Sequence, residues 1–359
     1  MNLTINQARP EELKAKPDEA ALGFGKLFTD HMFTMRYTHG VGWHDAEIKK
    51  YQEFTLAPSA MCLHYGQAIF EGLKAYRGAG DRILLFRPKD NLRRMNVSAD
   101  RICMAEFDVD QVLAAMKELI RLDQNWVPRS QGASLYIRPT MIATEAALGV
   151  RPSKEYLLFI ILSPVGAYYP EGFNPVKIYV SDSYVRAVPG GVGAVKTAGN
   201  YAASIKAAME AQAMGYTQVL WLDAVERRFV EEVGTMNIFF KINGQLITPP
   251  LAGSILPGIT RDSAIHLARD WGLDVQERPI SIDEVVAAND NGTLEEVFGT
   301  GTAAVISPVG SLYYQGRTIT LNQGRTGALS QKMFDVLQAI QYGHRPDPHG
   351  WIEPLYPFP

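Results

Sequence analysis

Apolar residues in the first half of the chain occur in two spacings, and each spacing predicts a different kind of element. Short uninterrupted apolar runs, typical of buried strands, occupy residues 82–86, 133–142 and 156–162. Apolar positions three and four apart predict helices, which we place at 88–100 and at 109–122 with Asp108 as the cap. The first half therefore predicts an α+β domain.

The second half of the chain has more strand-like segments, separated by helices with recognisable ends. Strands are predicted at 176–181, 218–222, 228–233, 237–242, 245–249 and 294–297. Helices are predicted at 200–214 and 260–271, and a further one begins near 281. Thr260 is the expected cap if the second helix has an ordinary start, and Ser281 with Glu284 forms a capping box for the third. Asn243-Gly244 predicts a tight hairpin.

A stretch dense in turn formers and aromatic residues, from Val165 to Asn174, is the predicted boundary between two domains. The expected organisation is a loose N-terminal arm (1–20), a small α/β domain (21–164), an interdomain loop (165–175) and a large domain (176–359). The Pro-rich end from Arg345 to Pro359 is interpreted as a surface tail. Together the segments predict the α/β class, of the α+β type, in two domains.

Composition and charge fit a globular protein of enzyme size and exclude several other classes. With 359 residues, 47% of them hydrophobic, and a net charge of -3, the chain has neither the composition of a disordered protein nor a nucleic-acid footprint. No apolar run reaches the ~18 to 20 residues of a membrane-spanning helix, and the polar start resembles no targeting signal. We therefore expect a cytoplasmic protein without nucleic-acid or membrane partners.

The cysteines and histidines indicate neither a disulfide framework nor a metal site. Only Cys62 and Cys103 are present, which excludes paired bridges and a four-cysteine zinc site. The 7 histidines show no H-E-x-x-H spacing. We expect no metal, and a reducing compartment is the default expectation.

Lys196 is the most informative single residue, because it lies among glycines and small apolar residues in the segment 190–201. Apolar neighbours disfavour an ammonium, and a neutral lysine amine can condense with an aldehyde. Two other interpretations stay open on this segment alone. One is a solvated lysine in a glycine-rich turn, and the other is a phosphate loop, although Val195 stands where that loop requires glycine.

Three further segments could contribute to an anion or cofactor site, although each alone also fits an ordinary turn or strand end. Residues 254–263 lead through a Pro-Gly turn into a helix, whose first N–H groups favour an anion. Residues 298–304 form a Gly/Thr turn after a strand, where the backbone can approach a ligand closely. Glu232 lies at the end of a predicted strand beside a glycine.

Eight motifs occur in a fixed order and cover most of the chain. They are FGKLFTDHM from Phe24, HYGQAIFEGLKAY from His64, FRPKDN from Phe86, LYIRP from Leu135, the Lys196 segment, EVGTMN from Glu232, LPGITR from Leu256 and GTA from Gly301. In this order they resemble the signatures of the branched-chain amino acid aminotransferases, which belong to the fold type IV pyridoxal-phosphate enzymes. The resemblance implies two α/β domains with the cofactor between them, and a homodimer as the minimal active unit.

The resemblance implies pyridoxal 5'-phosphate (PLP) as the cofactor. Lys196 would be the Schiff-base lysine and the acid and base that moves a proton between the substrate and the cofactor. Glu232 would bind the protonated pyridine nitrogen, and Tyr201 the ring hydroxyl. Four further residues would bind the phosphate, namely Arg94, Ile259, Thr260 and Thr302. Leu256 is the remaining implied cofactor-binding residue.

The same resemblance implies transfer of the amino group of leucine, isoleucine or valine to 2-oxoglutarate, giving the branched 2-oxo acid and glutamate. The implied substrate pocket is mostly aromatic or small, as an aliphatic side chain needs. Its members are Phe24, Tyr65, Phe70, Tyr136, Arg138, Tyr168, Thr235, Thr302 and Ala303. The amides of Thr302 and Ala303 would bind the α-carboxylate, and Arg138 the second carboxylate of glutamate.

Other activities are open on the same scaffold, namely a D-amino acid aminotransferase and an aminodeoxychorismate-type lyase. A nucleotide-phosphate-binding module is disfavoured by Val195, and a non-catalytic relative by the joint presence of Lys196, Tyr201 and Glu232. The chain departs from some animal members, which carry a C-x-x-C pair after the Gly-Thr-Ala turn. Here those positions read Ala-Val-Ile-Ser from Ala304, so no thiol switch is expected there.

Overall fold

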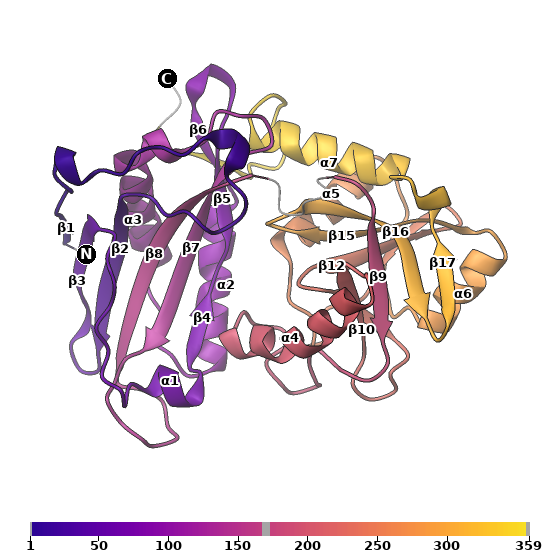
Figure 1. Ribbon diagram of the computed structural model, residues 1–359, viewed down its shortest axis with the longest axis horizontal. Coiled ribbons are helices and arrows are strands. Elements are labelled where there is room, and N and C mark those ends of the chain that lie inside the picture. The colour runs from indigo at the N-terminus through magenta and orange to yellow at the C-terminus, as the bar shows by residue number, and fades with distance from the viewer. Residues whose placement is uncertain (1, 167–172, 357–359) are drawn as a thin grey trace. The chain divides into compact units, whose positions relative to one another are not determined.

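The computed structural model describes residues 2–166 and 173–356, and the chain separates into two compact units. Unit 1 comprises Met1–Tyr168, Lys196–Ala198 and Ala339–Pro359, and unit 2 comprises Tyr169–Val195 and Gly199–Gln338. Each unit is built on one nine-stranded sheet (Figure 1). The units differ from the expected domains because the three residues from Lys196 and the C-terminal segment group with the first unit.

The sheet of unit 1 is largely antiparallel, as its hairpins and short connections require. Its strands in spatial order are β1 (Leu3–Ile5), β3 (Gly42–Lys50), β2 (His31–Thr38), β8 (Glu155–Val165), β7 (Ser134–Ala143), β5 (Leu73–Arg77), β6 (Ile83–Phe86) and β18 (Ile352–Pro354), and β4 (Ala68–Phe70) also pairs with β7. The edge strand β1 runs parallel to β3, whereas β18 is antiparallel to β6 at the other edge.

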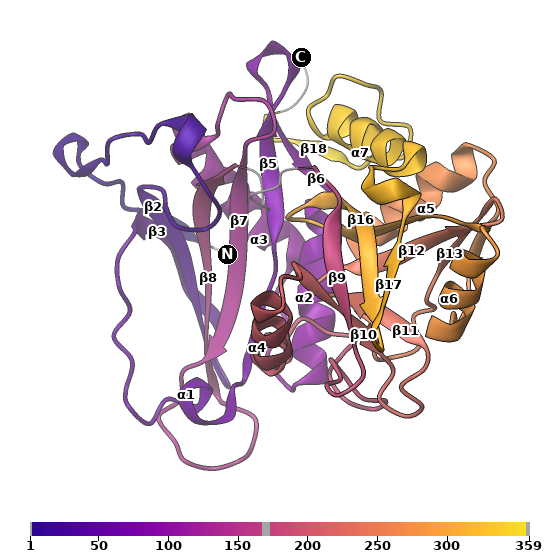
Figure 2. The same cartoon turned by 45° about the vertical axis from the view of Figure 1, so that its right-hand side comes forward.

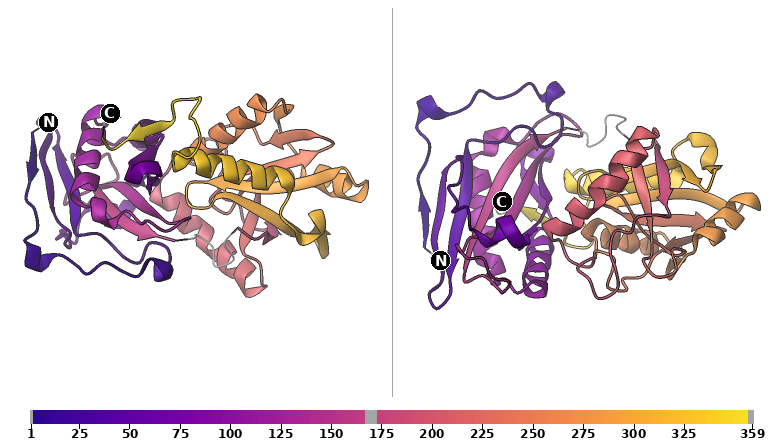
Figure 3. Two further views of the ribbon diagram at one scale, coloured as in Figure 1. Left: turned by 90° about the horizontal axis from the view of Figure 1, so that it is seen from above. Right: turned by 60° about the horizontal axis from the view of Figure 1, so that its bottom comes forward.

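Two amphipathic helices, α2 (Pro88–Arg101) and α3 (Val109–Leu122), cover one face of this sheet (Figures 1 and 3). Alternate residues of β7, such as Ile137, join Leu92 and Leu119 of the helices in the core. The residues between them, including Tyr136, therefore point to the opposite face of the sheet. The short helix α1 (Met61–Tyr65) precedes β4, and four 3₁₀ turns lie at Pro10–Glu12, Glu19–Ala21, Ala79–Asp81 and Gln124–Trp126.

The sheet of unit 2 mixes parallel and antiparallel pairs. Its strands in spatial order are β11 (Val230–Val233), β10 (Gln218–Leu222), β9 (Val176–Ser181), β16 (Val305–Tyr314), β15 (Leu294–Gly301), β12 (Asn237–Ile242), β13 (Gln245–Thr248) and β14 (Val275–Glu277), and β17 (Arg317–Thr320) also pairs with β16. Strand β9 is parallel to both of its neighbours, and β13 is parallel to β14. The terminal strand β11 carries Glu232.

Helices cover both faces of the second sheet. They are α4 (Ala198–Ala213), α5 (Ile259–Asp270), α6 (Ile282–Asp290) and α7 (Ala328–Gln341), and a 3₁₀ turn lies at Asn322–Gly324. Ala207 and Ala211 of α4 pack against Trp221 of β10, whereas α5 and α6 contact β15. Figure 2 shows α4 on one side of the sheet and α5 and α6 on the other. No helix among the described residues is long and apolar enough to cross a membrane.

Several local predictions are confirmed because the signals act within a few residues. Helix α3 spans Val109–Leu122, and Asp108 accepts a hydrogen bond from the N–H of Gln111 at 2.9 Å. The turn Asn243-Gly244 has φ angles of 49° and 78°, as a type I′ hairpin requires. Ser281 caps α6, although the Glu284 carboxylate pairs with Arg278 at 2.6 Å instead of completing the capping box.

Other predictions are wrong, two of them because a terminal segment pairs with a strand distant in the sequence. The N-terminal arm is not loose, since β1 pairs with β3. The Pro-rich end is not only a surface tail, since β18 pairs with β6. The cap of α5 is Gly258 instead of Thr260, and residues up to Gly301 continue β15 instead of forming a turn, which is confined to 302–304.

Candidate active site

The backbone of Lys196 is hydrogen-bonded to unit 1 on both sides. Its N–H donates to Ser98 Oγ of α2 at 3.0 Å, and its carbonyl accepts from the N–H of Phe70 in β4 at 3.2 Å. Thr197 forms an isolated antiparallel bridge with Ile69. The lysine is therefore held in a fixed position relative to α2 and β4, which is what an oriented nucleophile requires.

The side chain of Lys196 lies among aromatic and charged groups of unit 1. Its Nζ is 5.0 Å from the centre of the Phe70 ring. The pKa of Lys196 is lowered from 10.5 to about 8, chiefly by burial and then by Arg94, and the Glu71 carboxylate opposes both effects. A sizeable fraction of the amine is therefore neutral at mildly alkaline pH, which is the condition for nucleophilic attack.

Arg94 of α2 forms a bidentate ion pair with Glu71. Its Nε and Nη2 each lie 2.8 Å from a carboxylate oxygen of Glu71, which is fully buried. The pair fixes the plane of the guanidinium close enough to Lys196 to affect its pKa. Sequence reasoning missed Glu71, because nothing in its own motif indicates a partner 23 positions along the chain.

Unit 1 also brings together four of the predicted substrate-binding residues. The rings of Phe24 and Tyr136 meet edge to face, with centroids 5.0 Å apart. The Arg138 guanidinium lies 4.7 Å from the centre of the Phe70 ring, and its Nη2 donates to Tyr136 Oη at 3.1 Å. An apolar wall and a fixed cation thus stand side by side, so that this cluster can contact both aliphatic and anionic groups.

Lys74 of β5 is a second buried lysine that sequence reasoning missed. It is directly opposite Tyr136 in the β5–β7 register, so both side chains start on the same face of the sheet. It is only 6% exposed, and burial lowers its pKa to about 8. Together with Arg138, it makes this face of unit 1 more favourable for an anionic ligand.

Tyr65 and Tyr168 are the other two substrate residues predicted in the first half of the chain. Tyr65, at the end of α1, is 41% exposed, and its ring centre lies 6.1 Å from that of His64. Tyr168 lies outside the described residues. The roles of both stay predictions.

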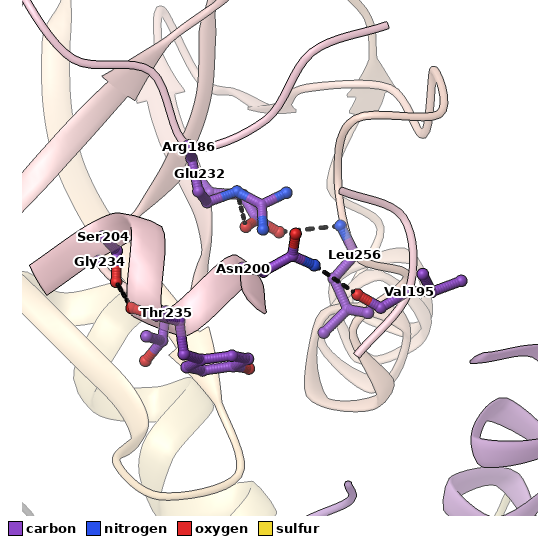
Figure 4. Close-up of a pocket in the computed structure, with 9 residues that line it drawn as sticks. Arg186, Val195, Asn200, Ser204, Glu232, Gly234, Thr235 and Leu256 are labelled. Carbon is purple, nitrogen blue, oxygen red and sulfur yellow. Dashed lines mark hydrogen bonds and ion pairs between the residues drawn. The ribbon is translucent and has the colours of Figure 1, made fainter. Parts of the chain in front are cut away.

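Unit 2 holds a small pocket that collects four more predicted residues (Figure 4). These four are Tyr201, Glu232, Thr235 and Leu256. The pocket is also lined by residues that the sequence did not indicate, namely Arg186, Val195, Asn200, Ser204 and Gly234. Asn200, in the first turn of α4, donates to the carbonyls of Val192 at 2.8 Å and Val195 at 2.9 Å, and so fixes the loop that precedes Lys196.

Glu232 is buried at the wall of this pocket, with an ion pair at one carboxylate oxygen and two hydrogen-bond donors at the other. Its Oε2 lies 2.7 Å from Nε of Arg186, as Figure 4 shows. Its Oε1 accepts from Asn237 Nδ2 and from the N–H of Leu256, each at 3.0 Å. Both donor types stabilise the ionised carboxylate, which can accept a further N–H from a ligand ring. Arg186 was missed, because a lone arginine 46 positions before its partner gives no local signal.

The turn into α5 and the turn after β15 complete the predicted set. Ile259 and Thr260 occupy the first turn of α5, at the end of the helix where the dipole is positive. A side chain at Gly258 would bring a Cβ within 1.9 Å of Asn237 Oδ1, so glycine is required for this close approach. Thr302 and Ala303 lie in the turn between β15 and β16.

Comparison with known proteins identifies the class of this enzyme. The amino-transferase class IV family matches residues 68–312, which is more than half of the chain. The chain therefore belongs to the class IV aminotransferases, which are PLP-dependent enzymes.

Within this class, the similar proteins are branched-chain-amino-acid aminotransferases. Branched-chain-amino-acid aminotransferase 2 of Bacillus subtilis (strain 168) is 55% identical over 348 residues, covering 97% of this chain and 96% of that protein. The structure of the Escherichia coli branched-chain amino acid aminotransferase has a TM-score of 0.77 at 28% identity, covering 91% of this chain and 99% of that one. The T.th. enzyme complexed with N-(5'-phosphopyridoxyl)-L-glutamate has a TM-score of 0.73 at 29% identity, covering 90% and 98%.

Proposed function

We propose that this enzyme transfers the amino group of leucine, isoleucine or valine to 2-oxoglutarate, giving the branched 2-oxo acid and glutamate. The observation that carries the proposal is the cluster in unit 1, where Lys196 lies beside an aromatic wall and the fixed Arg138 guanidinium. The names of the similar proteins support the branched-chain substrate, and the glutamyl complex of the T.th. enzyme supports glutamate as the second amino acid.

The residues present fit PLP. Lys196 would attach the aldehyde, because burial leaves its amine partly neutral. Glu232 would accept the N–H of the pyridine ring, and Tyr201 would hold the ring hydroxyl. Arg94, the first turn of α5 at Ile259 and Thr260, and Thr302 would bind the phosphate through a guanidinium and N–H groups. When bound, the cofactor supplies an electron sink for the substrate carbanion.

Lys196 would also move the proton. Its Nζ would take the proton from the substrate Cα and deliver it to C4′ of the cofactor, and the reverse half-reaction would move the proton the opposite way. A pKa of about 8 suits this double task, because both protonation states are accessible near neutral pH. The hydrogen bonds that join the Lys196 backbone to Ser98 and Phe70 would fix the position from which the amine acts.

The substrate side chain would lie against the rings of Phe24, Phe70 and Tyr136. An aliphatic chain buries apolar area on these rings, whereas the second carboxylate of glutamate pairs with Arg138. The α-carboxylate would bind the amides of Thr302 and Ala303, and the remaining predicted pocket residues are Tyr65, Tyr168 and Thr235.

A panel of L- and D-amino acids tests this function directly. Leucine, isoleucine, valine and glutamate should each change the visible absorbance of the bound cofactor, and D-amino acids should not. A reversed preference would favour the D-amino acid aminotransferase. Release of pyruvate from aminodeoxychorismate would favour the lyase.

We also propose that the enzyme is a homodimer. Large apolar side chains are exposed in both units: Leu148 (70%) and Val150 (88%) between β7 and β8, and Ile205 and Met209 (each 59%) on α4. Ile205 and Met209 are one helical turn apart and therefore lie together on α4, and a contiguous exposed apolar patch is typical of an interaction surface. Sedimentation of the wild type should give a dimer. Ile205→Glu with Met209→Glu should weaken it, whereas Lys206→Glu on the same helix serves as the control.

We also propose the domain boundaries and the cytoplasmic location of the protein that the sequence predicts. Limited proteolysis should cut within 165–175, of which 167–172 lie outside the described residues. Both cysteines are free thiols, and Cys103 is exposed, which fits a reducing cytoplasm.

A further inference from the structure

Two neighbouring carboxyl groups of β11 bind the same short segment of unit 2. Glu232 Oε1 accepts from the N–H of Leu256 at 3.0 Å, and Glu231 Oε1 accepts from the hydroxyl of Ser254. Adjacent residues of a strand point to opposite faces, so the segment 254–256 is held from both sides of β11. This segment leads directly into the first turn of α5.

Hydrogen bonds to the carbonyl of Ser254 connect this segment to the pocket. It accepts a hydrogen bond from Nη2 of Arg186, which also donates to the carbonyl of Gly193 at 3.1 Å. The Nε of the same guanidinium lies 2.7 Å from Glu232. A Cβ on Gly193 would lie 2.3 Å from the Ser254 carbonyl oxygen, so the two backbones are in close contact. The position of Ser254 therefore fixes where Arg186 sits.

Burial of the Glu231 carboxyl group at this position costs free energy. It is 7% exposed, and its Oε2 has no hydrogen-bond partner among the described residues. Burial raises the pKa of Glu231, while Ser254 and Arg186 oppose the rise. An unpaired buried oxygen destabilises the fold. Among the described residues, Glu231 acts on the pocket through its hydrogen bond to Ser254 and through its electrostatic attraction to Arg186.

We propose that Glu231 is a positioning residue for the cofactor site, acting through Ser254 and Arg186 on Glu232. It touches neither substrate nor cofactor. By holding the Ser254 hydroxyl it keeps the Ser254 carbonyl against Arg186, and Arg186 in turn keeps the Glu232 carboxylate in place for the ring nitrogen. The hydrogen bond between Glu231 and Ser254, which we call the clamp, also orients the start of α5, where the phosphate would bind. The inference rests on the proposed assignment of Glu232 and α5 to PLP.

The test uses the full-length protein in its cofactor-free and loaded forms. Ser254→Ala and Glu231→Ala each remove the clamp, and Glu231→Gln keeps an acceptor for the hydroxyl without the charge. Glu226→Ala is the matched control, because this glutamate is exposed in the turn before β11. The readouts are PLP affinity of the cofactor-free protein, and kcat and KM for leucine.

Loss of one hydrogen bond from a clamp of this kind should weaken PLP binding about tenfold in Ser254→Ala and Glu231→Ala. The kcat should fall with little change in KM, because no substrate contact is lost. The double variant should lose no more than either single variant, and Glu231→Gln should recover most of the affinity. Glu226→Ala should behave as the wild type.

Wild-type affinity and kcat in a folded Ser254→Ala protein would overturn the inference. So would an additive double variant. If Glu231→Ala does not fold, Ser254→Ala and Glu231→Gln still decide the question, because they change a single group each. Failure of the wild type itself to bind PLP would contradict the proposed function instead.

Discussion

Replacing Arg138 with methionine should impair the reaction with glutamate far more than the reaction with leucine. The guanidinium lies 4.7 Å from the Phe70 ring centre and donates to Tyr136 at 3.1 Å, and its Nε has no hydrogen-bond partner among the described residues. It therefore has capacity for a ligand carboxylate. A hydrogen bond to a charged group contributes about 1.5 to 3 kcal/mol, which is roughly 10- to 150-fold in kcat/KM for glutamate.

Leucine should lose less than about fivefold, because methionine is apolar, flexible and able to pack on the same rings. The assay is a stopped-flow reaction of the PLP form with each amino acid over a range of concentrations. Arg36→Met, at an exposed position on β2, is the matched control for removal of a positive charge. Equal losses for both amino acids would refute the reasoning, since Arg138 would then organise the site instead of recognising the second carboxylate.

Three further predictions concern the roles of Lys196 and Glu232. Lys196→Ala should abolish transamination while the protein stays folded and still binds PLP by its phosphate, whereas Lys206→Ala, whose side chain is 70% exposed, should retain activity in the same assay. Glu232→Gln should slow proton removal from leucine by orders of magnitude with a much smaller change in PLP affinity; unchanged single-turnover rates would make Glu232 a bystander. Burial lowers the pKa of Lys196 from 10.5 to about 8, so the cofactor-free fold must enclose a charged amine below pH 8. Lys196→Met should therefore raise the thermal midpoint at pH 7, and this advantage should disappear as the pH rises from 8 to 10.5, because the unfolded state alone binds the proton in that interval. A midpoint difference that is independent of pH would contradict the shift.

The sequence predicts elements well where the signal and its effect are neighbours. Asp108 caps the helix that begins at the next residue, and Asn243-Gly244 closes a hairpin between two adjoining strands. These features need no knowledge of the rest of the fold.

The sequence fails where the partner is distant. The cap of α5 is Gly258 and not Thr260, and position 258 requires glycine because Asn237 Oδ1 occupies the space of a side chain there. Glu71 and Arg186 are likewise defined by Arg94 and Glu232, which no local pattern connects to them. Electrostatic support of the site is therefore the part that only the structure supplies.

The pairing of β18 with β6 has a consequence for how the protein is made. Unit 1 begins with the first strands of the chain, yet its last strand, Ile352–Pro354, is synthesised after all of unit 2. Until those residues leave the ribosome, the edge of β6 is unpaired and open to wrong partners. The sheet of unit 2 is complete earlier in translation. Nascent chains shortened before residue 352 should therefore aggregate through unit 1 and need chaperones most at this stage.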